Sequence, residues 1–255
     1  MSRMFPRMDL YIGPANGKRI WLDERTVCGA GAASGLRAAF VSDVHFAKNF
    51  SAEPLIECIV GCAPDVIFFG GDFSDTRKQA LRLFESFRSL HAPLGIFAVP
   101  GYNDVEAFGS HAALAKELDS FGCRLLVNES AQAGPLAVAG VDELKYGAPV
   151  YDGLFAGRTG FRVLLSHYPA MPKGDMPDLM LSGHTHGGQF NAFGLTPFAI
   201  GFERVGGRSR MAPAMVSGFE PIGGLRLLGS KGIGASRIPL RIGVRPEIHL
   251  LKFEC

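Results

Sequence analysis

Short apolar runs and amphipathic segments alternate through the first half of the chain. Apolar runs bounded by turn residues, a pattern typical of buried strands, occupy residues 36–42, 65–71 and 94–101. Apolar side chains at helical spacing occupy residues 52–62, 76–90 and 110–122. Strands that alternate with helices of this length predict βαβ units and a mostly parallel sheet.

After residue 122 the pattern changes, because strand-like segments follow one another with short connections. These segments occupy residues 123–130, 135–143, 161–167, 178–184, 225–230 and 247–253. The first 35 residues are mixed in character and end in a run of small residues that predicts a loop. No Pro- or Ser-rich linker separates the two halves. We therefore expect one domain over residues 1–255 with two sheets, a core at 36–254 and an N-terminal extension at 1–35.

Composition narrows the class of protein. With 47% hydrophobic and 20% charged residues the chain has globular composition, and a net charge of +2 argues against a nucleic-acid partner. The five cysteines are odd in number and form no CxxC pair, which favours a reduced setting. No apolar run approaches the ~18 residues of a membrane span, and the N-terminus does not resemble a signal peptide. We expect a cytoplasmic protein, with peripheral contact at the inner face of the membrane left open.

Polar residues of metal-ligand type follow directly after five of the predicted strands. In chain order they are Asp43 and His45, Asp72, the segment Tyr102-Asn103-Asp104, His167, and His184 with His186. Ligands of open α/β sheets bind beyond the carboxyl ends of the strands. The five strand ends are therefore expected to converge on one site.

The chemistry of these side chains indicates a metal centre. Residues two apart on an extended segment point the same way, so Asp43 with His45, and His184 with His186, can each chelate. Imidazole and carboxylate ligands without thiolate suit Mn, Fe or Zn, and a bridging carboxylate can hold two ions ~3.5–4 Å apart for phosphoryl transfer. One Asp-x-His alone is usually accidental, but five such segments in order are not. Three histidines fall outside the pattern and are expected on the surface or in the core: His91, His111 and His249.

In this order the motifs resemble the signature of the calcineurin-like metallophosphoesterases, which runs Asp-x-His, Gly-Asp, Gly-Asn-His-Asp/Glu, His and Gly-His-x-His. The chain carries them as Asp43-Val44-His45, Gly71-Asp72, Gly101-Tyr102-Asn103-Asp104, His167 and Gly183-His184-Thr185-His186. The phrases GHTHGGQ and IPLRIGVRPEIHLLKF resemble the bacterial, often membrane-associated branch. Some members of that branch act on phosphate diesters or on pyrophosphates of lipid precursors.

The resemblance implies an α/β fold, a four-layer α-β-β-α sandwich with two mixed sheets, and a centre of two divalent metal ions. One ion would be held by Asp43, His45 and His186. The other would be held by His167 and His184. Asp72 would bridge the two ions, together with a metal-bound hydroxide that acts as the nucleophile.

Segment 101–104 departs from the family pattern. The family has an Asn metal ligand after the Gly and then a His that protonates the leaving group; this chain has Tyr102 and Asn103 there. Either the turn shifts and brings the Asn103 carbonyl to the metal, or Tyr102 stays in register and the amide ligand is lost unless the phenol coordinates. We favour the shift, because Asn tolerates unusual φ. Loss of the imidazole typically costs ~10²–10⁴-fold in rate. The residues assigned to catalysis are Asp72, Asn103 and Asp104.

Two segments after the last histidines bear on the substrate. An apolar wall for an acyl chain could come from Phe190, Phe193, Phe198 and Phe202, although packing under a long loop is the stronger interpretation. A grip on a second phosphate could come from Arg204, Arg208 and Arg210, although such a run is more often a solvated loop.

These observations predict a phosphoesterase that uses two ions of Mn, Fe or Zn to hydrolyse a phosphodiester or pyrophosphate bond. Its expected partner is a phosphate-containing small molecule or a lipid-linked substrate. The alternative is a catalytically weakened scaffold of the same fold that acts by protein contact, motivated by the altered 101–104 segment. A nuclease of this fold would need a basic stripe, which the net charge does not provide.

Overall fold

Two six-stranded mixed sheets form the centre of the computed structural model, which describes residues 11–14, 17–191, 195–197, 213–222, 224–235 and 238–255. The first sheet has the order β2 (Trp21–Val27), β14 (Glu247–Phe253), β3 (Arg37–Val41), β4 (Val66–Phe69), β5 (Ile96–Ala98) and β6 (Cys123–Leu125). The second has the order β11 (Gly218–Ile222), β12 (Leu225–Gly229), β10 (Leu179–Ser182), β9 (Phe161–Ser166), β8 (Leu136–Gly140) and β7 (Glu129–Ala133).

The central strands of both sheets are parallel. Strands β3 to β6 run in one direction, as do β8, β9, β10 and β12 in the other sheet. Antiparallel pairing brings β14 beside β3 and closes the second sheet with β7 and β11. Because parallel strands end at the same edge, the loops after them gather there, and this is where the candidate site lies.

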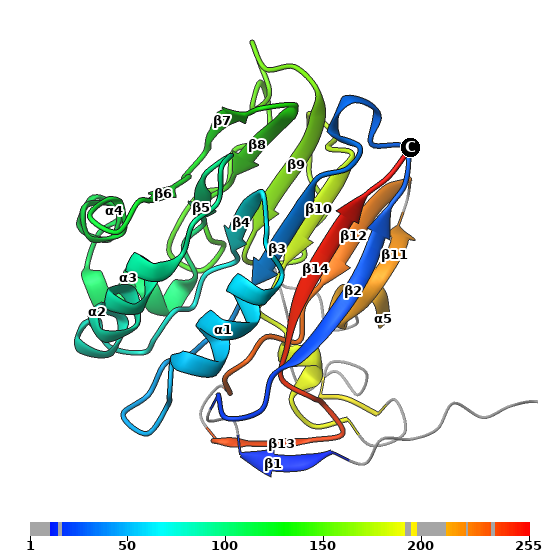
Figure 1. The fold of residues 1–255 in the computed structure, drawn as a ribbon. Helices are drawn as coiled ribbons and strands as arrows, with labels where there is room; N and C mark the ends of the chain where they lie inside the picture. The colour runs from blue at the N-terminus through cyan, green and yellow to red at the C-terminus, as the bar shows by residue number, and fades with distance from the viewer. Residues whose placement is uncertain (1–10, 15–16, 192–194, 198–212, 223, 236–237) are drawn as a thin grey trace, which may run out of the picture.

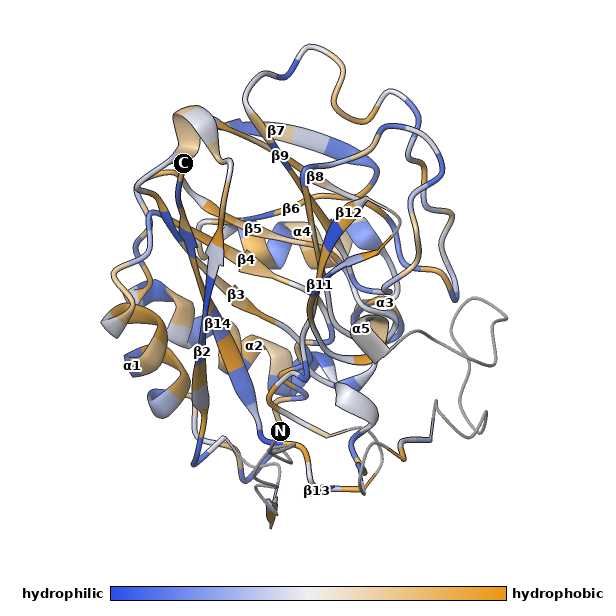
Figure 2. Cartoon of the chain, turned by 90° about the vertical axis from the view of Figure 1, so that its right-hand side faces the viewer, coloured by the Kyte–Doolittle hydropathy of each residue, from blue (hydrophilic) through white to orange (hydrophobic). Residues whose placement is uncertain are grey.

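Successive side chains of a strand point to opposite faces of the sheet, so alternate residues pack into different layers. In β3 and β4, Phe40 and Phe68 face the second sheet, where they pack with Val163 and Leu181. Their neighbours Val41 and Phe69 face outward and pack against helices. Both faces are apolar, which explains the continuous hydrophobic runs in the sequence and the orange central strands in Figure 2.

Helices cover the outer face of the first sheet (Figure 1): α1 (Glu53–Gly61), α2 (Arg77–Ser86), α3 (Tyr102–Phe108) and α4 (His111–Asp119). Thr76 and Ser110 cap α2 and α4 by accepting backbone N–H groups three residues on. On the outer face of the second sheet the described cover consists of the segment around Phe155 and the short α5 (Pro213–Val216). The expected α-β-β-α sandwich is confirmed, with a thin second helical layer.

Residues 21–27 lie within the segment 1–35 that we expected to be an N-terminal extension. They form the edge strand β2, which pairs with β14 in parallel along its whole length. Its partner strand lies more than 220 residues away along the chain, a distance over which the local sequence pattern carries no signal. Other elements that the pattern did not predict are α3, α5, β11, the pair β1 (Ile12–Pro14) and β13 (Leu240–Ile242), and 3₁₀ turns at Gly31–Ala33 and His186–Gly188. Residues Phe87–Ser89, expected within a helix, form a 3₁₀ turn at the end of α2.

The helices of the described residues are too short to cross a bilayer. The longest, α2, has ten residues, against the ~20 apolar residues that a span requires.

Candidate metal centre

The loops after β3, β4, β9 and β10 bring six predicted ligands to one edge of the two sheets. Five of these residues have left-handed backbone conformations, with positive φ at Asp43 (51°), His45 (42°), Asp72 (54°), His184 (68°) and His186 (52°). Such φ values are uncommon outside glycine, and clusters of them are typical of functional sites. The strained turns aim side chains from separate strands at a common point.

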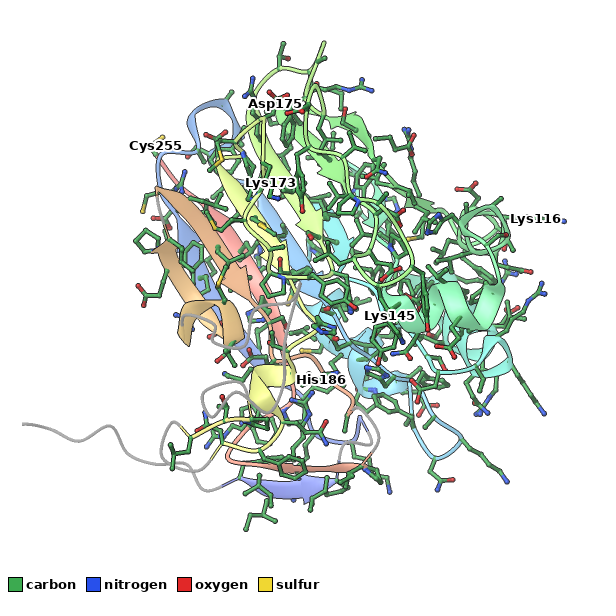
Figure 3. The ribbon with its side chains drawn as sticks, turned by 180° about the vertical axis from the view of Figure 1, so that it is seen from behind. Lys116, Lys145, Lys173, Asp175, His186 and Cys255 are labelled. Atoms are coloured by element: carbon green, nitrogen blue, oxygen red, sulfur yellow. The ribbon has the colours of Figure 1, made fainter. Side chains whose placement is uncertain are left out.

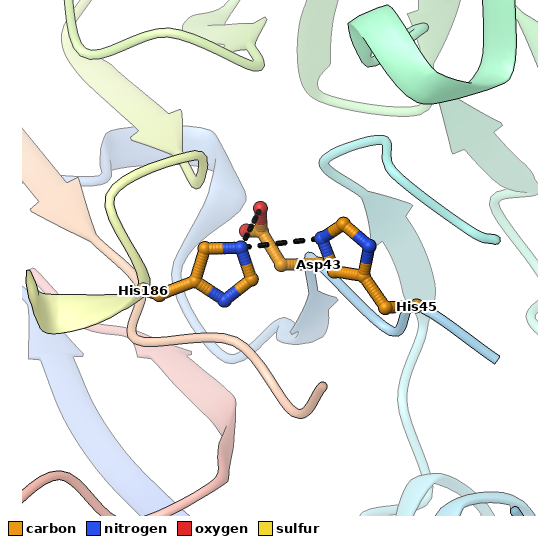
Figure 4. Close-up of side chains that lie close together, drawn as sticks. All are labelled: Asp43, His45 and His186. Atoms are coloured by element: carbon orange, nitrogen blue, oxygen red, sulfur yellow. Dashed lines mark hydrogen bonds and ion pairs between the residues drawn. The ribbon is translucent and has the colours of Figure 1, made fainter. Parts of the chain in front are cut away.

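One group of donors consists of Asp43, His45 and His186, whose ligand atoms lie within 4.8 Å of one another (Figure 4). The Nε2 atoms of His45 and His186 are 3.2 Å apart, and Oδ1 of Asp43 lies 3.5 Å from Nε2 of His186. The Nδ1 of His45 donates a hydrogen bond to Oδ1 of Asp75 at 2.7 Å. A carboxylate behind an imidazole is the arrangement that orients metal-binding histidines.

A second group consists of Asp43, Asp72 and His167, again with ligand atoms within 4.8 Å. The Nδ1 of His167 donates to the backbone carbonyl of Gly70 at 2.8 Å, so its Nε2 faces Oδ2 of Asp72 at 3.5 Å. This Nε2 is buried and has no hydrogen-bond partner among the described residues. Asp43 therefore belongs to both groups, which lie side by side.

The donor set fits divalent cations. Two imidazole nitrogens face each other at 3.2 Å, and a third imidazole nitrogen without a hydrogen-bond partner faces a carboxylate oxygen. Buried acceptors that point at one another repel unless a cation or a proton lies between them. Oxygen and imidazole donors without thiolate are those that Mn, Fe and Zn accept.

His184 lies beside this cluster but outside both compact groups. Its backbone N–H donates to both carboxylate oxygens of Asp43 at 3.0 Å. Its ring lies 5.2 Å from the ring of His167 and 4.0 Å from that of Tyr168, centroid to centroid. Burial, followed by the charge of His167, lowers the pKa of His184 to about 3, so the ring is neutral and retains a lone pair.

The carboxylates dominate the field in the cluster. Burial by itself would lower the pKa of His167, but the charges of Asp72 and Asp43 outweigh it and raise that pKa to about 10. Burial would likewise raise the pKa of Asp72, but His167 and His45 hold it well below its usual range. Both shifts describe a site that attracts positive charge, whether a proton or a metal ion.

The structure places the two residues of the altered segment differently. Asn103 lies in the first turn of α3, where its backbone N–H donates to Oδ1 of Asp72 at 3.0 Å and its side-chain amide to Oδ2 at 2.7 Å. The Tyr102 ring lies 6.1 Å from the ring of His184 and 6.4 Å from that of His167. The Asn103 amide therefore reaches the cluster through Asp72, while Tyr102 flanks it. The shifted turn and the role of Asn103 as a ligand stay predictions.

Asp104, assigned to catalysis from the sequence, is fully buried below the site. Its carboxylate accepts the backbone N–H groups of Asp72 (2.7 Å), Phe73 (2.8 Å) and Gly101 (2.9 Å). Burial and the charge of Asp72 raise its pKa to about 7, against the pull of these N–H donors. Through these hydrogen bonds Asp104 joins the loop after β4 to the loop after β5, an arrangement called the Asp104 clasp below. The contacts favour a positioning role for Asp104.

Two glycines allow the loops to approach this closely. A Cβ on Gly101 would lie 2.1 Å from Oδ1 of Asp72, and one on Gly183 would lie 2.2 Å from Oδ2 of Asp43. Real Cβ atoms do not make such contacts, so both positions require glycine.

Sequence reasoning assigned no role to two polar residues around the cluster. Arg241 is fully buried, and its Nη2 lies 3.2 Å from Nδ1 of His186 and 2.7 Å from the carbonyl of Lys231. Nothing near Arg241 in the sequence signals this contact, because β13 meets the site only in the folded chain. Asp75 lies within the GGDFSD motif, three residues after Asp72, and that proximity was a usable signal.

The remaining sequence expectations fall into two sets. His91 is exposed, His111 contacts Asp142 at 3.0 Å, and His249 is buried against Phe40. Phe190 is half-buried and bridges to Ile242. The other residues considered for substrate binding lie outside the described residues: Phe193, Phe198, Phe202, Arg204, Arg208 and Arg210.

The known proteins that resemble this chain in sequence include several that are named metallophosphoesterases. No family model matches the chain. It is 30% identical over 231 residues to an uncharacterised metallophosphoesterase of Bacillus subtilis, YkuE, an alignment that covers 84% of this chain and 77% of that protein. It is 30% identical over 203 residues to an uncharacterised metallophosphoesterase of Aquifex aeolicus, an alignment that covers 74% of this chain and 72% of that protein. Among solved structures, TT1561 of Thermus thermophilus has a TM-score of 0.49 and 13% identity, over 78% of this chain and 91% of that one.

Proposed function

The chain belongs to the metallophosphoesterase family, and from that premise we propose that it hydrolyses a phosphodiester or pyrophosphate bond with two divalent ions. The observation that carries this proposal is the pair of buried donor groups that share Asp43. Adjacent ion sites with a common carboxylate suit phosphoryl transfer, in which charge develops on both the attacking and the leaving oxygen. We further propose a phosphate-containing small molecule or a lipid-linked substrate.

The residues divide between holding ions and holding the loops. Asp43, His45 and His186 would hold one ion. His167 and His184, whose rings lie 5.2 Å apart, would hold the second ion. Asp72 would be shared by the two ions, since its Oδ2 lies 3.5 Å from Nε2 of His167 and 3.6 Å from Nε2 of His45, and Asp43 lies near both groups. Bound divalent ions supply Lewis-acid polarisation of phosphoryl oxygens and lower the pKa of water.

Segment 101–104 contains no imidazole that could protonate the leaving group. Asn103 stands at the family's histidine position, and an amide does not titrate near neutral pH. Its side chain instead donates to Asp72 and holds that carboxylate in place. We therefore propose substrates whose leaving group is stable without protonation, as in a pyrophosphate or an activated diester.

Hydrolysis of bis-p-nitrophenyl phosphate with Mn²⁺ tests the proposal. We expect activity in the parent chain, a loss of at least ~100-fold in His186→Ala, and no loss in the control His91→Ala, whose imidazole is exposed and outside the cluster. Metal content is measured on the same samples. Two bound ions without any hydrolysis in the parent would favour the scaffold instead, and failure to bind metal would contradict both.

A further inference from the structure

Two acidic side chains hold the turn at residues 142–148, which carries Lys145 beside the site. The carboxylate of Asp142 accepts the backbone N–H groups of Glu143 at 2.8 Å and Ala148 at 3.0 Å. The carboxylate of Glu143, fully buried, accepts the N–H groups of Lys145 at 2.6 Å and Tyr146 at 2.5 Å. Two acidic side chains thus satisfy four backbone donors and fix the direction in which Lys145 leaves the turn.

Neighbouring residues hold this turn to the body of the fold. The side-chain oxygen of Asn128 accepts the N–H of Asp142 at 3.1 Å, and its amide donates to the carbonyl of Ala148 at 2.9 Å. Nε2 of His111 on α4 lies 3.0 Å from Oδ1 of Asp142. The turn is therefore anchored at its base, while Lys145 itself is exposed.

Lys145 extends from this turn over the aromatic rim of the candidate metal centre. Its Nζ lies 4.3 Å from the centroid of the Tyr102 ring and 4.6 Å from that of Tyr146. The Tyr102 ring in turn lies 6.1 Å from the ring of His184. The Tyr102 ring is therefore near both the ammonium and the histidine cluster. Figure 3 labels Lys145 and His186 in the same part of the view, with Lys116 and Lys173 further off.

We infer that Lys145 and Tyr102 form an anion subsite that binds a second phosphate of the substrate, next to the phosphoryl group at the metals. This inference rests on the proposed function and narrows it to substrates with two linked phosphates. Because the Tyr102 ring lies next to both the ammonium and His184, the ammonium would contact the phosphate beside the one at the metals rather than the phosphorus that is attacked. An ammonium is a point charge that binds phosphate without a fixed direction, which suits a flexible diphosphate.

Electrostatics agree with a binding role for Lys145. A hydrogen bond with Tyr146 raises the pKa of Lys145, so the ammonium stays charged at neutral pH. A permanently charged lysine attracts an anion but donates no proton to a leaving group at neutral pH.

Binding of two ligands that differ by one phosphate tests the subsite without turnover. The Mn²⁺-loaded full chain is titrated by calorimetry with AMP and with the methylene-bridged analogue of ADP, whose phosphates cannot be cleaved apart. We expect the parent to bind the diphosphate at least ~10-fold more tightly than AMP, since charge-assisted hydrogen bonds to phosphate are strong. Lys145→Ala should remove this preference, and Lys145→Arg should retain most of it.

The matched control is Lys116→Ala, which removes an exposed lysine on α4 and leaves the preference unchanged. An unchanged preference in Lys145→Ala, or no preference in the parent, would overturn the subsite. Equal loss in both lysine variants would show a general charge effect and would also overturn it. Because no hydrolysis is measured, this result is independent of the diester assay, which tests the proposed function by itself.

Discussion

At the scale of single residues, one carboxylate ties together the loops that carry the candidate ligands. Asp104 accepts three backbone N–H groups from two different loops, and it is fully buried. A neutral amide at this position can accept with one oxygen only, which would leave at least one buried N–H facing an NH₂ group. The alignment of Asp72 with His167 therefore depends on a side chain that belongs to neither donor group.

We predict that Asp104→Asn lowers the free energy of unfolding by ~1–3 kcal/mol, the cost of a buried donor without an acceptor. Chemical denaturation measures this change, and titration with Mn²⁺ should show weaker binding in the same variant. Asp119→Asn, which alters an exposed carboxylate at the end of α4, is the control and should change neither quantity. A stable Asp104→Asn variant with parental metal affinity would contradict the clasp.

We also predict that Gly101→Ala abolishes metal binding. The new methyl carbon would lie 2.1 Å from Oδ1 of Asp72 and would displace either that carboxylate or the first turn of α3. Metal content after purification measures the effect. The control Gly109→Ala places a methyl in open space at a strained C-terminal position of α3, and should cost stability without removing metal.

The altered 101–104 segment has a kinetic consequence. Without an imidazole to protonate the leaving group, the rate should depend steeply on the leaving-group pKa. A series of aryl phosphodiesters with leaving groups of increasing pKa should show rates that fall by a large factor at each step. Asn103→His, which restores the ring, should flatten that dependence. A shallow dependence in the parent would point to another proton donor in the site.

At the scale of elements, the edge strand β2 is held to the first sheet by a polar contact inside an apolar layer. Asp23 on β2 accepts from Nδ1 of His249 on β14 at 2.9 Å and from Nε of Arg25 at 2.8 Å. Burial opposes ionisation of Asp23, but these hydrogen bonds outweigh it and lower its pKa to about 2. The ionised carboxylate therefore stabilises the pairing of β2 with β14.

We predict that Asp23→Asn destabilises the chain by about 1 kcal/mol at pH 7. One pKa unit corresponds to about 1.36 kcal/mol, and the partial exposure of the pair reduces the full effect. Because the folded pKa lies below the unfolded value of about 3.9, this stability is present above pH ~4 and is lost as the pH falls toward 2.

Unfolding of the parent and of Asp23→Asn between pH 7 and pH 3 checks the sign. The difference should be constant above pH ~5 and shrink below pH ~4. Glu24→Gln, on the same strand but with an exposed ion pair to Lys252, should cost less than about 0.5 kcal/mol at any pH. A difference that grows on acidification would contradict the assignment.

At the scale of the whole molecule, the candidate site forms where loops of the two sheets contact each other, so it depends on how the sheets pack. His167 and His184 come from the second sheet, whereas Asp43, His45 and Asp72 come from the first. Facing acceptors from two sheets repel one another unless a cation or a proton lies between them. Bound ions should therefore stabilise the contact between the sheets.

We predict that a chelator lowers the melting temperature and that added Mn²⁺ restores it. Ligands that bind the folded state only contribute RT ln(1 + [L]/Kd), about 2.7 kcal/mol at 100 times Kd. Calorimetric scans at several Mn²⁺ concentrations measure the shift. In His186→Ala, which lacks one donor, the shift should be clearly smaller than in His91→Ala. If Mn²⁺ raised the melting temperature of the two variants equally, the ions would bind at a site that does not include His186.

The sequence by itself determined the layered α/β fold and the positions of the donor residues along the chain. Buried parallel strands require continuous apolar runs, and loops at their carboxyl ends are where ligand-type residues stand out, so Asp43, Asp72 and His184 were visible in a linear pattern. The altered segment was visible too, since Tyr102 and Asn103 follow Gly101 directly.

Only the tertiary structure decided which side chains meet. Asp43 lies in both donor groups, Asp104 clasps two loops, and Arg241 contacts His186 across 55 residues. The edge strand β2 and the turn that holds Lys145 over Tyr102 depend in the same way on partners far away in the chain. Periodicity and motif spacing report local backbone geometry, whereas contacts between distant segments follow from how the two sheets pack.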